Sequence, residues 1–176
     1  MFLVNYENAL SEENCGRLIS LFESVPDYHQ VYDTGMPQWT ELNLTEHRER
    51  WSELFTSLSR LYVNTFVQFI TETGAMCPRP TRLEDFRMKR YTGTDRFDLH
   101  TDVVNHATAR RYLVGLLYLN EPSGGEIEFP QHDLIIRPKT GDFLIFPPMW
   151  HMAHIAHPVA TNDVKYLISS YCHYED

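Results

Sequence analysis

The residues with the clearest chemical meaning in this 176-residue sequence are His100 and Asp102, which stand two positions apart in His100-Thr101-Asp102. On a β-strand, residues i and i+2 project from the same face. An imidazole and a carboxylate would therefore point side by side into one cavity. Together with a histidine from another strand they would form a two-histidine, one-carboxylate triad. Such a triad leaves coordination positions open and is used by non-haem Fe(II) oxygenases.

A second group of histidines follows later in the chain, where His151, His154 and His157 lie close together. One of them could supply the third ligand from a later strand. A single His-x-Asp pair arises readily by chance, however, and clustered histidines also occur as packing residues or adventitious metal patches. Zinc accepts the same ligand types. From the residues alone, an iron site, a zinc site and an ordinary polar strand face all remain open.

The second half of the chain has the sequence pattern of a β-rich domain. After Pro78 and Pro80, short runs of β-forming residues are separated by turn signals such as Thr92-Gly93 and Ser123-Gly124-Gly125. Eight short strands without intervening helices favour a sandwich, a barrel or a jelly roll. The predicted strands cover residues 82–91, 96–103, 111–120, 125–129, 133–138, 142–147, 151–157 and 164–172.

The first part of the chain is predicted to be helical. Ser11 is followed by two glutamates, the arrangement of a capped helix start, and Pro26 ends this helix. We predict a loop over residues 26–44. A long apolar stripe at helical spacing then predicts a second helix, which Thr45 would cap and Gly74 would end. Stripes of this kind pack against a core, so we assign them no chemistry.

Length and composition fit one globular domain. The chain is 43% hydrophobic and 13% aromatic, which provides enough apolar material for a core and suits sheets better than a small helical bundle. We therefore predict a single, mainly β domain of the α+β class over residues 1–176. In this prediction residues 1–77 provide helical support, with two helices, for a β core in residues 78–176.

Charge and cysteine content limit the partners and the compartment. A net charge of −9 opposes general binding to nucleic acid or to anionic membranes, so we expect neither partner. No apolar run reaches the ~18 residues of a membrane span, and the first residues lack the pattern of a secretory signal. The three cysteines are odd in number and widely spaced, which favours a reducing compartment. We therefore expect a cytoplasmic protein.

Residues 86–171 carry an ordered set of motifs that resembles the catalytic core of the prolyl 4-hydroxylase-like 2-oxoglutarate and Fe(II)-dependent dioxygenases. Each motif alone is common, but their order and spacing are specific, and the set covers about half of the chain. The family's fold is a double-stranded β-helix of the jelly-roll or cupin kind, in agreement with the predicted strands. The motifs are Met88-Lys89-Arg90-Tyr91-Thr92-Gly93, Phe97-Asp98-Leu99-His100-Thr101-Asp102, Arg111, Tyr118-Leu119-Asn120, Gly124-Gly125-Glu126, Phe129-Pro130, Arg137-Pro138-Lys139-Thr140-Gly141-Asp142, Leu144-Ile145-Phe146, His154-Ile155-Ala156-His157-Pro158-Val159 and Lys165-Tyr166.

The resemblance implies three iron ligands. His100 and Asp102 match the two early ligands, and His154 matches the distal one. Position within the predicted strand favours the same histidine, because His151 follows a proline-rich turn and His157 precedes Pro158, which restricts it. We therefore expect His154 to be the ligand and its two neighbours to be dispensable.

The resemblance also implies a co-substrate site. Lys165 matches the basic residue that holds the distal carboxylate of 2-oxoglutarate, and a buried lysine is costly unless it is paired. Tyr91 and Tyr118 match tyrosines that hydrogen-bond the co-substrate in relatives. Tyr171 matches a pocket-lining aromatic residue more loosely. We expect Arg111 to brace the pocket or shape its entrance rather than to contact iron.

The function implied by the resemblance is that of a dioxygenase. Such an enzyme uses Fe(II), 2-oxoglutarate and O2, with ascorbate as the expected reductant, and releases succinate and CO2. The predicted substrate is a prolyl residue in a peptide or protein. Relatives that act on a free amino acid or another small molecule look similar. A non-haem iron enzyme that does not use 2-oxoglutarate and a non-enzymatic jelly-roll metal-binding module are further alternatives. The sequence leaves open whether the predicted loop 26–44 covers the site.

Overall fold

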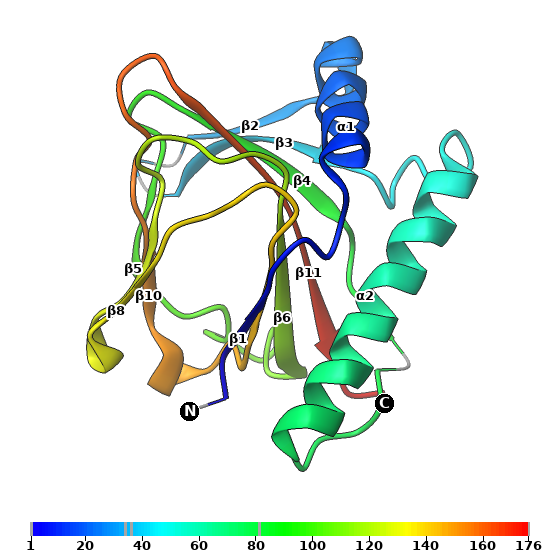
Figure 1. Ribbon diagram of the computed structural model, residues 1–176, viewed down its shortest axis with the longest axis vertical. Helices are drawn as coiled ribbons and strands as arrows, with labels where there is room; N and C mark the ends of the chain where they lie inside the picture. The colour runs from blue at the N-terminus through cyan, green and yellow to red at the C-terminus, as the bar shows by residue number, and fades with distance from the viewer. Residues whose placement is uncertain (1, 34, 36, 81, 176) are drawn as a thin grey trace.

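The computed structural model describes residues 2–33, 35, 37–80 and 82–175, and two β-sheets that face each other form its centre (Figure 1). One sheet has seven strands in the order β1-β9-β6-β11-β4-β3-β2, and the other has four in the order β5-β10-β7-β8. Neighbouring strands run antiparallel throughout. This architecture is the predicted jelly roll, or double-stranded β-helix. The strands are β1 (Val4–Tyr6), β2 (Gln30–Asp33), β3 (Gln38–Asn43), β4 (Arg87–Thr92), β5 (Phe97–His100), β6 (Arg111–Tyr118), β7 (Ile127–Phe129), β8 (Leu134–Ile136), β9 (Phe143–Phe146), β10 (His154–Ala156) and β11 (Val164–His173).

Two helices, α1 (Glu12–Ser24) and α2 (Ser52–Thr73), lie on the side of the seven-stranded sheet that faces away from the four-stranded sheet (Figure 1). Helix α1 begins where predicted, because the Ser11 side chain accepts a hydrogen bond from the Asn14 N–H. Helix α2 ends at Gly74, whose φ of 66° is the left-handed conformation that glycine adopts easily.

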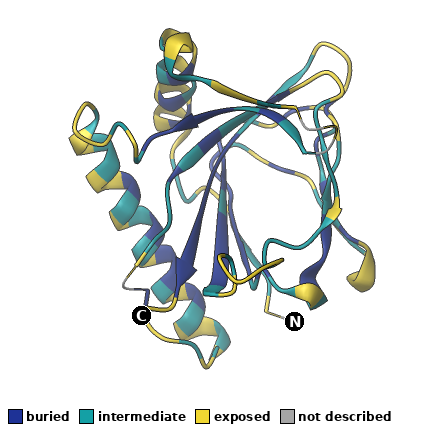
Figure 2. Ribbon diagram, turned by 180° about the vertical axis from the view of Figure 1, so that it is seen from behind, coloured by how far each residue is buried: buried dark blue, intermediate teal, exposed yellow. Residues whose placement is uncertain are grey.

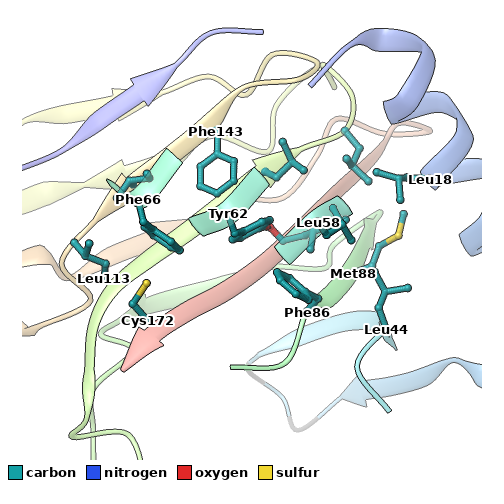
Figure 3. Packing of buried hydrophobic residues seen from close by; sticks show 14 of the residues in the cluster. Leu18, Leu44, Leu58, Tyr62, Phe66, Phe86, Met88, Leu113, Phe143 and Cys172 are labelled. Carbon is teal, nitrogen blue, oxygen red and sulfur yellow. The ribbon is translucent and has the colours of Figure 1, made fainter. Parts of the chain in front are cut away.

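The main hydrophobic core lies between the helices and the seven-stranded sheet (Figure 3). Tyr62 of α2 is fully buried, and its hydroxyl donates a 2.7 Å hydrogen bond to the carbonyl of Ile168 on β11. Gly115 of β6 allows the helix to approach this closely, since a Cβ there would lie 2.6 Å from the Phe143 ring and 2.9 Å from the Phe66 ring. Helix α2 therefore packs against the outer face of the sheet, and the inner face remains available for a site.

The inner face of the seven-stranded sheet carries a second, smaller cluster of buried residues, shared with the four-stranded sheet. Strands β3, β6, β9 and β11 of the large sheet are buried over much of their length, while exposed residues gather in loops and on the outer sides of the helices (Figure 2). Neither described helix has the length and apolar character needed to cross a bilayer.

Each of the eight strands predicted after Pro78 overlaps an observed strand, β4 to β11. The prediction for residues 26–44 is wrong. This segment contains a short 3-10 helix, Pro26–Tyr28, and then β2 and β3, which pair with each other. Strand β3 also pairs with β4, so both strands extend the large sheet. Gly35, which suggested a loop, lies in the connection between two strands.

The predicted start of the second helix is also wrong. Helix α2 begins at Ser52, after a turn region, and Trp51 is its N-cap without a side-chain hydrogen bond. The Thr45 hydroxyl instead accepts a 2.9 Å hydrogen bond from the N–H of Phe86. Residues 1–77 are therefore not purely a helical support, because they contribute β1, β2 and β3 to the seven-stranded sheet.

Candidate active site

A single cavity of about 300 Å³ brings together every site residue identified from the sequence. Its walls come from the inner faces of both sheets. On one side stand residues of β5 and β10, and on the other residues of β4, β6 and β11. The eight predicted residues that line it are Tyr91, His100, Asp102, Arg111, Tyr118, His154, Lys165 and Tyr171.

His100, Asp102 and His154 form a compact triad, with potential ligand atoms that all lie within 4.8 Å of one another. The two histidines are direct partners across the antiparallel β5–β10 pair. Asp102 follows β5, and its carboxylate lies 3.8 Å from Nε2 of His100 and 3.9 Å from Nε2 of His154. Each residue thus directs one ligand atom toward a common point.

Backbone carbonyls fix the orientation of both imidazoles. Nδ1 of His100 lies 2.7 Å from the carbonyl oxygen of Asp98, and Nδ1 of His154 lies 3.0 Å from that of Met152. Each contact makes Nδ1 the protonated nitrogen and leaves Nε2 with a free lone pair, as metal ligation requires. Burial, with a smaller effect from His154, lowers the pKa of His100 to about 4. The His100 imidazole is therefore neutral, the form that binds a metal.

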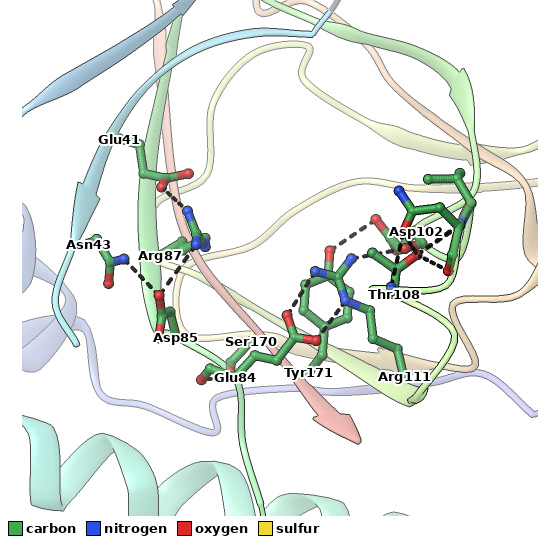
Figure 4. Close-up of polar contacts among 12 residues, drawn as sticks. Glu41, Asn43, Glu84, Asp85, Arg87, Asp102, Thr108, Arg111, Ser170 and Tyr171 are labelled. Atoms are coloured by element: carbon green, nitrogen blue, oxygen red, sulfur yellow. Dashed lines mark hydrogen bonds and ion pairs between the residues drawn. The ribbon is translucent and has the colours of Figure 1, made fainter. Parts of the chain in front are cut away.

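Arg111 and Tyr171 hold Asp102 in place (Figure 4). The Tyr171 hydroxyl donates a 2.9 Å hydrogen bond to the Asp102 carboxylate, and the Arg111 guanidinium donates one of 2.8 Å to its backbone carbonyl. The guanidinium also forms two hydrogen bonds with Glu84, of 2.7 and 2.8 Å, and lies 3.9 Å from the centre of the Tyr171 ring. Arg111 thus contacts the backbone of Asp102 and adds no ligand atom to the triad.

A buried cation stands in another part of the same cavity. Lys165 is 1% exposed, and burial lowers the pKa of its ammonium group to about 7. The ammonium donates a 2.9 Å hydrogen bond to the carbonyl of Gly125 and lies 4.6 Å from the centre of the Tyr91 ring. Tyr118, also buried, lines the cavity with these residues. Lysine, aromatic rings and phenol hydroxyls together form a pocket suited to a carboxylate.

Gly125, which the sequence marked as part of a turn and of a family motif, also lies beside the buried lysine. Its φ is +69°, and a Cβ at this position would lie 3.1 Å from Cδ of Lys165. The glycine therefore permits both the turn and the close approach of the lysine. The Gly124-Gly125 pair was a detectable signal, since consecutive glycines mark a backbone that needs positive φ.

A wall of the cavity comes from the hairpin that the sequence did not reveal. Tyr32 of β2 and Trp39 and Glu41 of β3 line it, together with Arg87 and Lys89 of β4. The alternation of Trp39 and Glu41 was the available signal for β3, because residues two apart share a strand face. Residues of β2 and β3 therefore form part of the wall of the site.

The neighbouring histidines do not belong to the triad. His151 lies in the short 3-10 helix Trp150–Met152, and its carbonyl oxygen is 2.7 Å from the His132 ring. His157 follows β10, and its Nε2 is 2.6 Å from the Glu128 carboxylate. Of the three histidines, His154 is the one that faces Asp102 across the cavity.

Comparison with known proteins relates the chain to oxygenases. The model of the 2OG-Fe(II) oxygenase superfamily matches residues 86–173, half of the chain. An inferred prolyl 4-hydroxylase of Acanthamoeba polyphaga mimivirus is 25% identical over 141 residues, which cover 73% of this chain and 55% of that protein. The chain thus spans about half the length of this relative.

Solved structures with a similar fold include several prolyl hydroxylases. That of Trichoplax adhaerens, in complex with a peptide fragment of the hypoxia-inducible factor oxygen degradation domain, has a TM-score of 0.75 at 17% identity, over 97% of this chain and 83% of that one. The viral collagen prolyl hydroxylase of Paramecium bursaria Chlorella virus-1, in its 2-oxoglutarate complex, has a TM-score of 0.69 at 17% identity, over 97% of this chain and 95% of that one. A Pseudomonas putida prolyl-4-hydroxylase has a TM-score of 0.71 at 14% identity, over 99% of this chain and 93% of that one.

The fold and the family match agree with each other. The matched segment, residues 86–173, runs from the start of β4 to the end of β11 and includes all three triad residues. The solved structures have a similar fold over nearly the whole of this chain. The chain belongs to the 2OG-Fe(II) oxygenase superfamily.

Proposed function

We propose that this protein is a 2-oxoglutarate- and Fe(II)-dependent dioxygenase that hydroxylates a prolyl residue in a peptide or protein. One observation carries the proposal. Two imidazole nitrogens and a carboxylate converge within 4.8 Å, on the same cavity as a buried lysine that lacks an anionic partner among the described residues. The family match and the prolyl hydroxylases of similar fold support the same reaction.

The donor set fits Fe(II). Nε2 of His100, Nε2 of His154 and the Asp102 carboxylate would hold the ion, and this set leaves coordination positions open for other ligands. Zinc also accepts these donors, and the family match favours iron. When bound, Fe(II) and 2-oxoglutarate would together supply the activation of O2 that oxidises a C–H bond of the substrate, with release of succinate and CO2.

The remaining residues of the cavity would bind and orient the co-substrate. The Lys165 ammonium would pair with the distal carboxylate of 2-oxoglutarate, which restores the charged form that burial disfavours. Tyr91 and Tyr118 would offer phenol hydroxyls to the same carboxylate. The Tyr171 hydroxyl and the Arg111 guanidinium would keep Asp102 in position during turnover. The aromatic walls would exclude water from the reacting atoms.

The substrate and the cellular setting are also part of the proposal. A structural neighbour bound to a peptide fragment supports a peptide or protein substrate. Ascorbate is the proposed reductant that keeps iron in the ferrous state. The three free cysteines support a reducing compartment, and we propose the cytoplasm.

The direct test is product analysis. Purified protein with Fe(II), ascorbate, O2 and 2-oxoglutarate should form succinate, slowly alone and faster with the right peptide. Mass spectrometry of a proteome incubated with active enzyme should show +16 Da on proline, and the Asp102→Ala variant should show none. Hydroxylation confined to residues other than proline would contradict the proposed substrate. Lack of succinate from folded, iron-loaded protein would contradict the enzyme itself.

A further inference from the structure

Among the described residues that line the cavity, Lys89 is a cation that the proposed function leaves unused. The other three cations already have a partner or a proposed ligand. Arg87 pairs with Glu41 at 2.7 Å, and Arg111 pairs with Glu84. Lys165 is assigned to 2-oxoglutarate. Lys89 therefore contributes a positive charge that has no role in the reaction as proposed so far.

Lys89 lies half-buried in the middle of β4, opposite Leu167 of β11 and Glu41 of β3. Its ammonium group is 4.1 Å from the centre of the Trp39 ring. Within the described part of the chain this ring contact stands alone, and the ammonium group forms no hydrogen bond or ion pair there. A cation held by an aromatic ring keeps its hydrogen-bonding capacity for another group.

Glu41, the nearest carboxylate along the sheet, is not available to Lys89. It is 1% exposed, and one of its oxygens accepts the 2.7 Å hydrogen bond from Arg87. Its other oxygen accepts a 3.1 Å hydrogen bond from the indole N–H of Trp39. Glu41 thus fixes the plane of the indole ring on which Lys89 rests. Trp39 also packs against Phe97, whose ring stacks on the triad residue His100.

The loaded cavity would carry one unbalanced positive charge. Fe(II), Asp102, the 2-oxoglutarate dianion and Lys165 together sum to zero, and the two Arg–Glu pairs cancel internally. The charge that remains is that of Lys89. A substrate that brings one negative charge would balance the cavity.

We propose that Lys89, positioned by Trp39, binds a carboxylate of the substrate. This inference rests on the proposed function and names a chemical property of its substrate. A second polar group is at hand: the Ser169 hydroxyl is buried and unpaired among the described residues, lines the same cavity, and lies diagonally across the β4–β11 pair from Lys89. Ammonium and hydroxyl together can satisfy both oxygens of one carboxylate.

The carboxylate could be the α-carboxylate of a terminal or free amino acid, or an acidic side chain beside the reacting proline. Two matched probe pairs distinguish these sources. N-acetylproline is compared with N-acetylprolinamide, and a capped Pro-Asp dipeptide with a capped Pro-Asn dipeptide. Binding is measured by calorimetry without O2, on protein loaded with Mn(II) and 2-oxoglutarate, so that no turnover occurs.

The wild-type protein should bind the acidic member of at least one pair about 30-fold more tightly than its amide. The Lys89→Met variant, which keeps the side-chain length, should lose this preference, and Lys89→Glu should reverse it. Lys139→Met, at an exposed lysine remote from the cavity lining, should retain it. Circular dichroism confirms that each variant is folded.

Three results would overturn the inference. The wild-type protein could fail to prefer either acidic probe, including by binding none of the four. The preference could persist in Lys89→Met. Alternatively, Lys89→Met could lower the affinity for 2-oxoglutarate by a similar factor and leave the preference for the acidic probes unchanged. That result would assign Lys89 to the co-substrate. In each case normal Mn(II) and 2-oxoglutarate binding by the wild-type protein would leave the proposed dioxygenase function intact.

Discussion

Burial of Lys165 makes the affinity for 2-oxoglutarate depend on pH. Only the ammonium form can pair with the co-substrate carboxylate, and burial lowers its pKa from 10.5 to about 7 in the free protein. The lysine is charged below this value and loses its proton as pH rises above it. The Kd for 2-oxoglutarate should then rise tenfold per pH unit, on the order of 100-fold between pH 6 and pH 9. Arginine stays charged over this range, so Lys165→Arg should show a nearly flat profile.

Calorimetry on Mn(II)-loaded protein measures this dependence directly. Above pH 7, binding should be accompanied by uptake of close to one proton, seen as a dependence of the heat on the ionisation enthalpy of the buffer. Lys139→Arg, a change at an exposed lysine, should keep the wild-type profile. A Kd that does not change between pH 6 and pH 9 would refute the reasoning. So would an equal rise in Lys165→Arg, because the titrating group would then lie elsewhere.

Other variants test the ligands and their supports. His154→Ala should lose bound Fe(II) and all turnover, whereas His151→Ala and His157→Ala should keep most of both; metal analysis and succinate assays would reveal the opposite pattern if the assignment were wrong. Arg111→Met should weaken Fe(II) binding roughly 10- to 100-fold rather than abolish it, because the residue positions a ligand; an unchanged Kd for Fe(II) would deny this role. Gly125→Ala should lower the free energy of unfolding by about 1–2 kcal/mol, because its φ is +69° and its Cβ would crowd Lys165. Chemical denaturation measures this loss, and an unfolding free energy equal to that of the wild-type protein would show that the turn accommodates the Cβ without strain.

The strands after Pro78 were predictable because their signals are local. Alternation and glycine-containing turns are properties of a few neighbouring residues, and they mark β4 to β11. The β2–β3 hairpin was not predictable in the same way. Its strand character depends on pairing with β4, some 45 residues later in the chain, as in the Leu42–Met88 pair. The start of α2 was missed for a related reason, since Thr45 serves the long-range contact with Phe86 rather than the helix.

In the candidate site too, features with a local sequence signal were predictable and features that depend on long-range contacts were not. The His-x-Asp spacing and the order of the motifs are properties of the sequence itself, and through the family resemblance they point to the three residues that the structure brings together. The choice of His154 acquires its physical basis from its direct pairing with His100 across β5 and β10. The partnership of Arg111 with Glu84, 27 residues earlier in the chain, had no local signal. Nor did the Trp39–Lys89 contact, because strand pairing alone brings those side chains together.

The central claim is that His100, Asp102 and His154 hold Fe(II) in a way that leaves room for chelating 2-oxoglutarate. The most direct test is an absorption spectrum of the protein with Fe(II) and 2-oxoglutarate under strictly anaerobic conditions. We predict a weak visible metal-to-ligand charge-transfer band in the wild-type protein, which requires both components and is absent in folded Asp102→Ala. No band in folded, iron-loaded wild-type protein, or an equal band in Asp102→Ala, would contradict the account.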